Sequence, residues 1–497
     1  MQKPASNISA CLAQKQTPWT SIFTTAAMMC LTGLQKSIYL SSTWPYVTSM
    51  YPEISMTLFG WATAANPLGC AVANPIFGYW NQKTGSTIKP LTMGYFICAL
   101  GNLFYAILPS VPTSLFPASL FLSRFLIGCG CATLVNLRSF IATASTSDDR
   151  VKAVSVGTAG YTAGFSLGPG LQILFLPLGV LGFSFGSVVF NTYTAAAWFM
   201  VFVNLVALVL ANALLVEDYA GIVTDEEKKD DPWLVIPQSD RTAVFLLFFI
   251  WCIYSGFAST EHLATTVTMV MYNWNSEEAV LYNGLLQTVN CVANTATYIL
   301  IGSTRFGKLW ETFKAIEVWF RDSRIHLVLG FLAFLAFYTI HLPYPFYDGP
   351  LDRTPVVNGT MIPGAGGCSW NYDWCDNTTR VPKNLYLFAF SVLLGIGFPL
   401  VSHPCFTILS QVLGPRKQGL VQGLIAFTGN IYQFITPLSS SIIFEATGYG
   451  YIIGWHVVMI SICLVLIFCF RKRLVPLELT PPLGEGRKYK SGTLYRF

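Results

Sequence analysis

Long apolar runs alternate with short polar segments along almost the whole chain. Leu58 to Trp80 contains no charged side chain, and neither does Leu91 to Pro109. About 20 apolar residues are enough for a helix to cross the hydrocarbon core of a bilayer. Such runs predict twelve spans, at residues 19–46, 58–80, 91–109, 117–142, 153–177, 195–216, 242–271, 279–301, 325–341, 385–410, 418–443 and 450–470. The pattern therefore predicts an all-α polytopic membrane protein.

One acidic polar segment divides these runs into two sets of six. It contains Asp225, Glu226, Glu227, Asp230 and Asp231. Two bundles of six transmembrane helices joined by a charged linker are a common transporter plan. The expected divisions are an N-terminal segment 1–18, a first bundle 19–216, a linker 217–241, a second bundle 242–470 with a polar loop 342–384, and a tail 471–497.

The composition supports a membrane protein and excludes an ordinary soluble domain. Hydrophobic residues make up 53% of the chain and charged residues only 11%, with a mean hydropathy of +0.53. The net charge of +5 is small and spread out, so it gives no reason to expect nucleic-acid binding.

The placement of the basic residues predicts the topology. With a cytoplasmic N-terminus, 24 of the 29 Lys and Arg residues are expected on the cytoplasmic side, three (Arg353, Arg380, Lys383) in the polar loop and two (Lys36, Arg124) within spans. Basic residues are enriched in cytoplasmic loops. Both termini are therefore expected in the cytoplasm.

The polar loop carries features that are useful only on a lumenal or extracellular side. Asn358 and Asn377 begin acceptor sequences for N-glycosylation, and Cys368 and Cys375 lie close together. The two cysteines are either a disulfide, which an oxidising compartment permits, or two unpaired thiols.

Ionisable residues inside spans are costly and therefore mark candidate sites. They include Lys36, Arg124, Glu261, His262 and His403, which fall on the first, fourth, seventh and tenth spans. Equivalent helices of three-helix repeats surround one central cavity in transporters. Two cations with one carboxylate favour an anion there, with Glu261 as a proton carrier; the alternative is that Glu261 only neutralises a cation.

Sequence motifs for catalysis or for a cofactor are absent. There is no phosphate-binding loop with Lys and Ser or Thr, no pair of metal-spaced histidines and no nucleophile elbow. We therefore expect neither an enzyme nor a bound metal or cofactor.

Several ordered stretches resemble the major facilitator superfamily, and among its members a lysosomal branch. They include SSTWPYV (41–47), NPIFGYW (74–80), SRFLIGCG (123–130), GFSLGPG (164–170), MYNWNSEEAVLYNG (271–284) and LGPRKQGLVQG (413–423). The resemblance implies a twelve-helix transporter of the lysosomal or endosomal membrane, glycosylated in its lumenal loop and linked to chloride movement.

The same resemblance assigns roles to three groups of residues. Arg124 falls in the fourth-helix motif of the family. A gating loop is expected at Gly78, Gln82, Lys83 and Gly85, where Gln82 replaces the acid of the family pattern, and a helix-bend motif at Gly164, Gly168 and Pro169. Tight helix packing explains the last group equally well.

Three functions follow from these features. We expect transport of a small anion through a cavity between the bundles, and the resemblance implies that this anion is chloride. The second hypothesis is proton-coupled export of a small organic anion, and the third is a receptor or scaffold that moves nothing. The sequence does not predict an oligomeric state.

Overall fold

The apolar runs fold into long helices, because backbone polar groups in hydrocarbon can be paired only within a helix or a closed barrel. The computed structural model describes residues 16–39, 42–50, 56–146, 148–179, 182–185, 188–221, 236–260, 264–302, 322–357, 360–361, 366–370, 372–478, 486–489 and 492–495.

The first half of the chain forms one helical bundle. Its helices are α2 (Trp19–Ser37), α3 (Thr43–Met50), α4 (Met56–Thr84), α5 (Ile88–Ala106), α6 (Phe116–Cys131), α7 (Thr133–Ala144), α8 (Arg150–Leu174) and α9 (Thr192–Leu214), with short 3₁₀ turns η1 (Leu108–Ser110) and η2 (Leu176–Leu178). A small antiparallel hairpin, β1 (Phe183–Phe185) and β2 (Val188–Phe190), precedes α9 and pairs Ser184 with Val189.

The second half forms a second bundle. Its helices are α11 (Arg241–Thr260), α12 (Ala264–Tyr272), α13 (Ser276–Gly302), α16 (Ser323–Ile340), α17 (Lys383–Phe388), η6 (Ala389–Leu394, a π-helix), α18 (Gly395–Leu413), α19 (Gly419–Thr447) and α20 (Tyr449–Cys469). Outside the bundle lie η5 (Asp373–Asn377) and two antiparallel hairpins, β3 (Val356–Val357) with β4 (Thr360–Met361) and β5 (Gly486–Tyr489) with β6 (Gly492–Tyr495).

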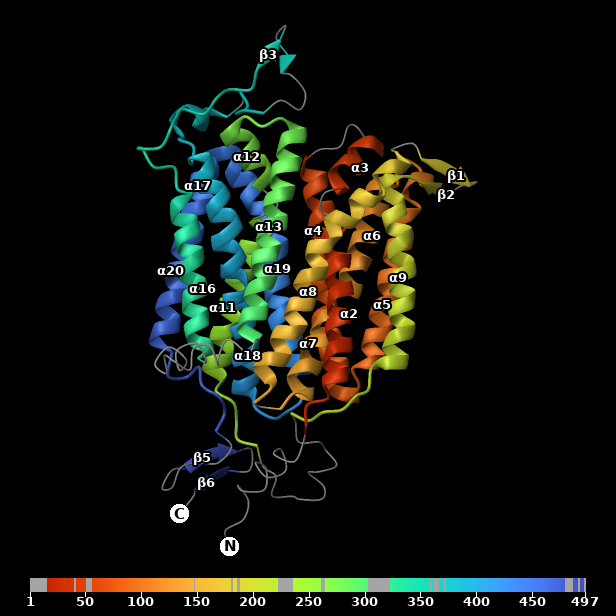
Figure 1. Cartoon of the computed structure of the whole chain (residues 1–497), viewed down its shortest axis with the longest axis vertical. Helices are drawn as coiled ribbons and strands as arrows, with labels where there is room; N and C mark the ends of the chain where they lie inside the picture. The colour runs from red at the N-terminus through yellow and green to blue at the C-terminus, as the bar shows by residue number, and fades with distance from the viewer. Residues whose placement is uncertain are drawn as a thin grey trace.

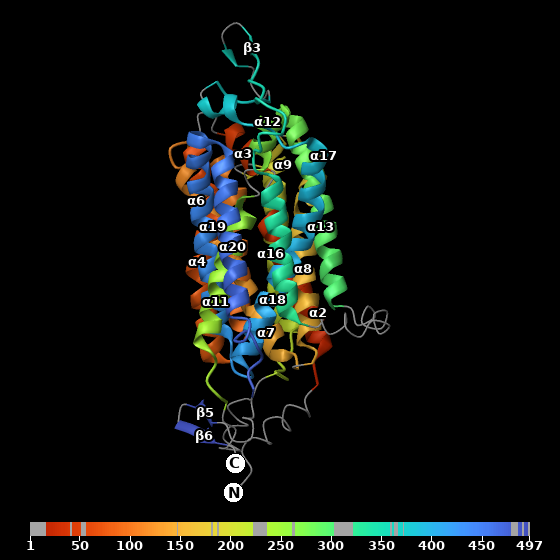
Figure 2. The same cartoon turned by 90° about the vertical axis from the view of Figure 1, so that its left-hand side faces the viewer.

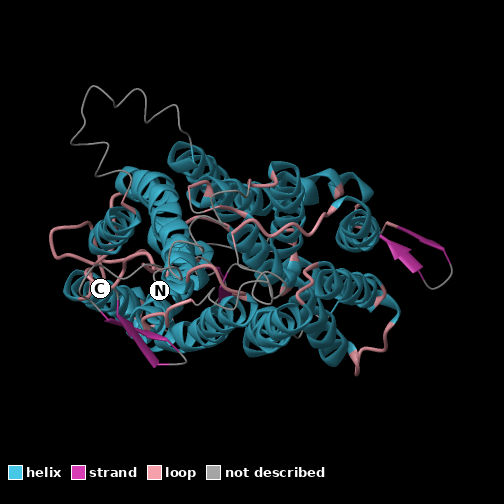
Figure 3. Cartoon of the chain, turned by 90° about the horizontal axis from the view of Figure 1, so that it is seen from below, coloured by secondary structure: helices cyan, strands magenta, loops and turns pink. Residues whose placement is uncertain are grey.

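The two bundles stand side by side with their helices roughly parallel (Figure 1), and the view from below shows the helices of both halves nearly end-on (Figure 3). The helix α2 begins, and α20 ends, at one end of the bundles, which we call the terminal end. The described parts of residues 342–382 lie at the opposite end of the second bundle, which we call the loop end (Figure 2). Five described helical segments are long and apolar enough to cross a membrane by length and composition: Phe116–Ala144, Thr192–Leu214, Ser323–Ile340, Lys383–Leu413 and Tyr449–Cys469. The helices are consistent with twelve spans, a number that stays a prediction.

Two expected spans are interrupted. The first was expected to continue to residue 46, but α2 ends at Ser37 and α3 begins at Thr43. The hydroxyl of Thr43 donates to the carbonyl oxygen of Tyr39 (2.5 Å), which also accepts from the backbone N–H of Thr43 (3.0 Å). The fourth expected span is divided at Ala132 into α6 and α7.

The bundles meet mainly through α4 against α19 and α8 against α13. Backbones touch in the first of these contacts. A Cβ atom on Gly78 would lie 2.4 Å from the carbonyl oxygen of Gly419, and one on Gly423 would lie 2.6 Å from that of Asn74. Small residues of this kind let membrane helices approach closely.

Candidate functional site

Two of the predicted cations lie inside the first bundle. Lys36 is in the last turn of α2, and Arg124 lies on α6 with only 5% of its surface exposed. The guanidinium carbon of Arg124 is 5.5 Å from the ring centre of Tyr39, and its Nε is buried without a hydrogen-bond partner. A cation over an aromatic face is partly stabilised by the ring, but that contact leaves its hydrogen-bonding capacity unused.

A network of side-chain amides supports Arg124 through Tyr39. The hydroxyl of Tyr39 donates to Asn102 Oδ1 (2.5 Å), and Asn102 exchanges hydrogen bonds of 2.8 and 3.2 Å with Gln35. Gln35 Oε1 also accepts from Asn204 Nδ2 (2.8 Å). These residues come from α2, α5 and α9, so the network fixes the ring beside Arg124 from three helices.

A third cation, Arg138, was not predicted as a site residue. It falls inside the expected span 117–142, yet it was one of the 24 basic residues assigned to the cytoplasmic side. It lies on α7, six residues or about 9 Å before the helix ends at Ala144. The signal that identifies it is the one that identified Arg124: a charged residue within an apolar run.

Aromatic rings of both bundles surround Arg138. Its guanidinium carbon lies 4.2 Å from the ring centre of Phe406 on α18, 5.5 Å from Trp251 on α11 and 5.8 Å from Tyr161 on α8. A small cavity of about 10 Å³ adjoins Arg138 and also has Gln422 of α19 in its wall. Arg138 therefore faces the boundary between the bundles, and its Nε is buried without a hydrogen-bond partner.

The three cations are electrostatically connected. The positive charges of Lys36 and Arg138 repel each other, and those of Lys36 and Arg124 both act on the Cys131 thiol at the end of α6. Ion pairs among the described residues include Arg324 with Asp322, Arg353 with Asp376, Arg380 with Asp352, and Arg473 with Asp240. None of these carboxylates neutralises Lys36, Arg124 or Arg138. Glu261 and His262 lie outside the described residues, so the predicted meeting of Glu261 with the cations stays a prediction.

His403 occupies a different place from the other predicted cavity residues. It is fully buried on α18, and its Nε2 lies 3.1 Å from the carbonyl oxygen of Val151 at the start of α8. A carbonyl can only accept, so Nε2 carries the proton and donates. The structure thus places His403 in a hydrogen bond between the two bundles, and no described contact joins it to Lys36 or Arg124.

The predicted gating loop lies at the terminal end between the bundles. Gln82 Oε1 accepts from the backbone N–H of Leu420 (3.0 Å), in the first turn of α19. Gly85 ends α4 with a φ of +67°, a conformation that favours glycine, and Lys83 is exposed. Gln82 is therefore a direct polar link from α4 in the first bundle to α19 in the second.

The predicted helix-bend glycines pack α8 against α2. A Cβ atom on Gly164 would lie 1.8 Å from the carbonyl oxygen of Cys30, and one on Gly168 would lie 2.0 Å from Ser37 Oγ. The helix α8 also contains Pro169 and continues from Arg150 to Leu174. Close packing of the backbones accounts for both glycines in this structure, and the bending role stays a prediction.

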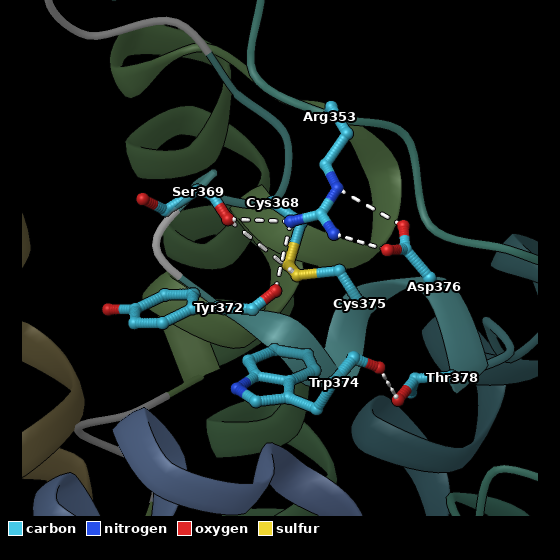
Figure 4. Close-up of polar contacts among 8 residues, drawn as sticks. All are labelled: Arg353, Cys368, Ser369, Tyr372, Trp374, Cys375, Asp376 and Thr378. Atoms are coloured by element: carbon cyan, nitrogen blue, oxygen red, sulfur yellow. Dashed lines mark hydrogen bonds and ion pairs between the residues drawn. A yellow bond between two sulfur atoms is a disulfide. The ribbon is translucent and has the colours of Figure 1, made fainter.

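The polar loop is an ordered cap in its described part. A disulfide joins Cys368 to Cys375, and Arg353 bridges the same segment by pairing with Asp376 (2.7 Å) and donating to the carbonyl oxygens of Ser369 and Tyr372 (both 2.9 Å), as Figure 4 shows. Asn377 follows on the exposed surface, whereas Asn358 lies outside the described residues.

Two bundles of apolar helices with charged residues buried between and within them define a multi-pass membrane transport protein. The profile of the Major Facilitator Superfamily matches residues 25–361, and the chain belongs to that family. The family and the solved neighbours are transporters rather than enzymes.

The comparisons also find a curated relative and two solved structures that are similar to this chain. The chain is 26% identical to "Major facilitator superfamily domain-containing protein 8" of Xenopus laevis, over 93% of each chain. The solved human organic anion transporter MFSD10 (TETRAN) shares 14% identity with a TM-score of 0.54, over 94% of this chain and 100% of the other. A bacterial homologue of the iron transporter ferroportin, in an outward-facing state, shares 13% identity with a TM-score of 0.60, over 90% and 99%. At these identities the two structures show the fold alone.

Proposed function

We propose that this protein moves a small anion, with chloride as the preferred cargo, through the boundary between its two bundles. The observation that carries this proposal is the set of three cations, Lys36, Arg124 and Arg138, for which the described residues provide no carboxylate. Burying a charge in a bilayer is costly unless a charge of opposite sign compensates it. A mobile anion would provide that compensation.

The cations are spaced along the membrane normal. Arg124 and Arg138 are 14 residues apart on α6 and α7, or about 21 Å at 1.5 Å per residue. Cations at separate depths would offer an anion a succession of attractive positions instead of one deep trap. Several moderate sites favour passage, because an anion must both enter and leave.

Arg138 lies where a movement of one bundle against the other would directly affect transport. Its aromatic neighbours Phe406 and Trp251 belong to the second bundle, whereas Arg138 and Tyr161 belong to the first. Rocking of one bundle against the other would separate these rings and expose the guanidinium to the aqueous side. The links through Gln82 and His403 at the same boundary would break in that movement.

We place the protein in the lysosomal or endosomal membrane with both termini in the cytoplasm. An exposed Asn377 and a disulfide at the loop end suit a lumenal, oxidising side. Arg471, Lys472 and Arg473 follow α20 at the terminal end and suit the cytoplasmic side.

A small organic anion is the second candidate cargo. The same cations would bind a carboxylate, and a solved transporter of similar fold carries organic anions. In that case Glu261 is the proposed proton site, and Glu261→Gln is expected to remove the pH dependence of transport. A receptor or scaffold would transport neither kind of anion.

The deciding experiment measures chloride uptake into proteoliposomes that contain the purified full-length protein. Arg138→Gln is expected to lower the flux about tenfold or more, because a charge-assisted contact is lost, whereas Arg138→Lys keeps part of it. Arg473→Gln is the matched control, because this arginine is half-exposed outside the bundles. The chloride flux of this variant should equal that of the wild type.

Three outcomes would change the proposal. Equal chloride flux in wild type and Arg138→Gln would remove Arg138 from the path. Flux of organic anions but not of chloride would favour the second candidate. No flux of either, with protein that elutes as a single species, would leave the scaffold as the working hypothesis.

A further inference from the structure

A second cavity lies entirely inside the second bundle, near the loop end. Its volume is about 90 Å³ and it is partly open, so it can take one end of a larger molecule. Its walls come from α11, α12, α16, α17, η6, α18 and α20. No wall residue belongs to the first bundle, so this cavity is separate from the boundary that holds Arg138.

The walls of this cavity are uncharged and rich in aromatic rings. Phe257, Phe337, Phe390 and Phe398 come from four different elements, and none of the described residues that line the space is Asp, Glu, Lys or Arg; Glu261 and His262, between Phe257 and Ala264, lie outside the described residues. An ion would enter such a site at a large desolvation cost. The chemistry of the walls selects a neutral and mostly apolar ligand.

Among the described residues of the wall, His341 has a buried polar atom without a partner. His341 directly follows α16 and is only 4% exposed, and its Nδ1 lies 2.7 Å from the carbonyl oxygen of Phe337. Because a carbonyl only accepts, Nδ1 carries the proton and Nε2 of the neutral ring is a lone-pair acceptor. This Nε2 is buried without a hydrogen-bond partner, which is costly for a buried acceptor.

The rings around His341 hold it in this orientation. The ring centre of Phe337 is 4.1 Å from that of His341, and Tyr386 of α17 meets it edge-on at 5.0 Å. Neither the tautomer nor the ring direction can change without breaking the bond to Phe337. A ligand that satisfies Nε2 must therefore donate a hydrogen bond.

The backbone at this cavity is also unusual. Residues 389–394 form η6, a π-helix, and two of its residues, Phe390 and Leu394, line the space. π-Helical turns are rare and occur frequently at functional sites. A π-helical turn contains one residue more than an α-helical turn, so its side chains point in other directions than those of a regular α-helix. This shift places Phe390 and Leu394 in the wall of the cavity.

We propose that this cavity binds a neutral, largely apolar alcohol whose hydroxyl group donates to His341 Nε2. Two membrane-resident sources share that chemistry, a sterol and a lipid with a long-chain alcohol. The aromatic walls hold the part of the apolar body next to the hydroxyl group, and the histidine selects the hydroxyl group. The described walls of the site are separate from Arg138, and the site would act as a lipid-responsive site on the second bundle.

The test is equilibrium binding of tritiated cholesterol, and separately of tritiated 1-hexadecanol, to purified full-length protein in sterol-free detergent. Each alcohol is compared with its own methyl ether as competitor, because the ether keeps the apolar body and loses the donor. At least one alcohol should bind saturably to the wild type and compete about tenfold better than its ether. The alcohol that binds identifies the source.

Two variants locate the binding. His341→Phe keeps an aromatic ring and removes the acceptor, so the preference for alcohol over ether should fall to nearly one. Ile452→Trp fills the cavity from α20 and should abolish binding. The matched control is Leu329→Trp, which adds the same ring on a lipid-facing side of α16 and should bind like the wild type.

The proposal fails if neither alcohol binds the wild type saturably, or if alcohol and ether compete equally. It also fails if His341→Phe keeps the preference, or if Ile452→Trp, folded as judged by its elution and melting temperature, binds normally. The comparison of alcohol with ether in the wild type needs no variant and is therefore decisive even if a substitution disturbs folding.

Discussion

The interiors of the two bundles differ in emphasis, although the first also buries the rings of Tyr39 and Tyr105 and the second also buries Asn290. The first bundle buries amides and cations: Gln35, Asn102 and Asn204 share one hydrogen-bond network, and Arg124 lies beside it. The second bundle buries rings, for example Phe334 against Phe398 at 5.1 Å and against Phe257 at 5.7 Å. One family fold thus supports a polar interior in one half and an aromatic interior in the other.

The difference matters because the two kinds of interior tolerate change differently. A hydrogen-bond network in a low-dielectric region specifies one arrangement, and every unpaired member costs free energy. Aromatic packing is less directional and leaves room for a cavity, as in the space lined by His341 and Phe390. We therefore expect the first bundle to be the rigid, charge-bearing half and the second to be the half that adapts to a ligand.

The largest effect is expected where backbones touch in the first bundle. Gly164→Ala would place a Cβ atom 1.8 Å from the carbonyl oxygen of Cys30, so α8 and α2 must separate. We expect a loss of about 3 kcal/mol or more and poor recovery of folded protein, comparable to overpacking of a tight core. The measurement is the yield of monodisperse protein and its melting temperature.

A glycine of the second bundle provides the control for Gly164→Ala. No heavy atom lies within 4 Å of a Cβ atom built on Gly454 of α20. Gly454→Ala should therefore be neutral or stabilising by up to about 1 kcal/mol, because alanine has the higher helix propensity. Equal damage from both substitutions would refute the assignment of tight packing to α2 and α8.

The next effect concerns the amide network itself. Gln35→Leu removes the acceptor of Asn102 and Asn204 and leaves both amides short of a partner, so we expect a loss of about 2–3 kcal/mol. In the second bundle, Phe334→Leu changes only ring packing and should cost about 1–2 kcal/mol. Thermal unfolding of both variants in one detergent measures the difference. A larger loss for Phe334→Leu would reverse the comparison between the bundles.

The sequence predicts the architecture well because hydropathy and charge act along the chain. Apolar runs such as 91–109 have to become helices in a bilayer, and the order of the motifs identifies the family. The site is predicted only in part. Lys36 and Arg124 are visible as charges inside apolar runs, whereas Arg138 lies four residues inside the end of the run 117–142 and was assigned to the adjoining loop.

The remaining features depend on contacts between distant residues. Gln35, Asn102 and Asn204 are single amides that hardly change the hydropathy of their runs, so nothing in the sequence joins them. His341 lies at the edge of the polar loop, and only the folded chain places its ring in the wall of the second cavity. Residues that act through tertiary contacts in this way cannot be found from local patterns.

The smallest predicted effect concerns the link between the two halves. The side-chain carbonyl of Gln82 accepts from Leu420 N–H in the first turn of α19, where the helix dipole favours negative charge. Gln82→Glu keeps the acceptor and adds that charge, as in the acidic family pattern. It should strengthen the contact between α4 and α19 at the terminal end by about 0.3–1 kcal/mol.

Because the terminal end must open for transport, a stronger link should slow transport without harming folding. We expect Gln82→Glu to lower the anion flux about two- to fivefold at low salt, since 1 kcal/mol corresponds to roughly a fivefold change in an equilibrium constant. The effect should weaken as salt rises, because the added charge is partly exposed to solvent. Gln82→Leu loses the acceptor, so the terminal end should open more readily. The measurement is the rate at which a thiol reagent labels a cysteine placed at Lys83, which should rise in Gln82→Leu. If Gln82→Glu and Gln82→Leu change that rate in the same direction, the hydrogen bond to Leu420 does not hold the two differently built bundles together.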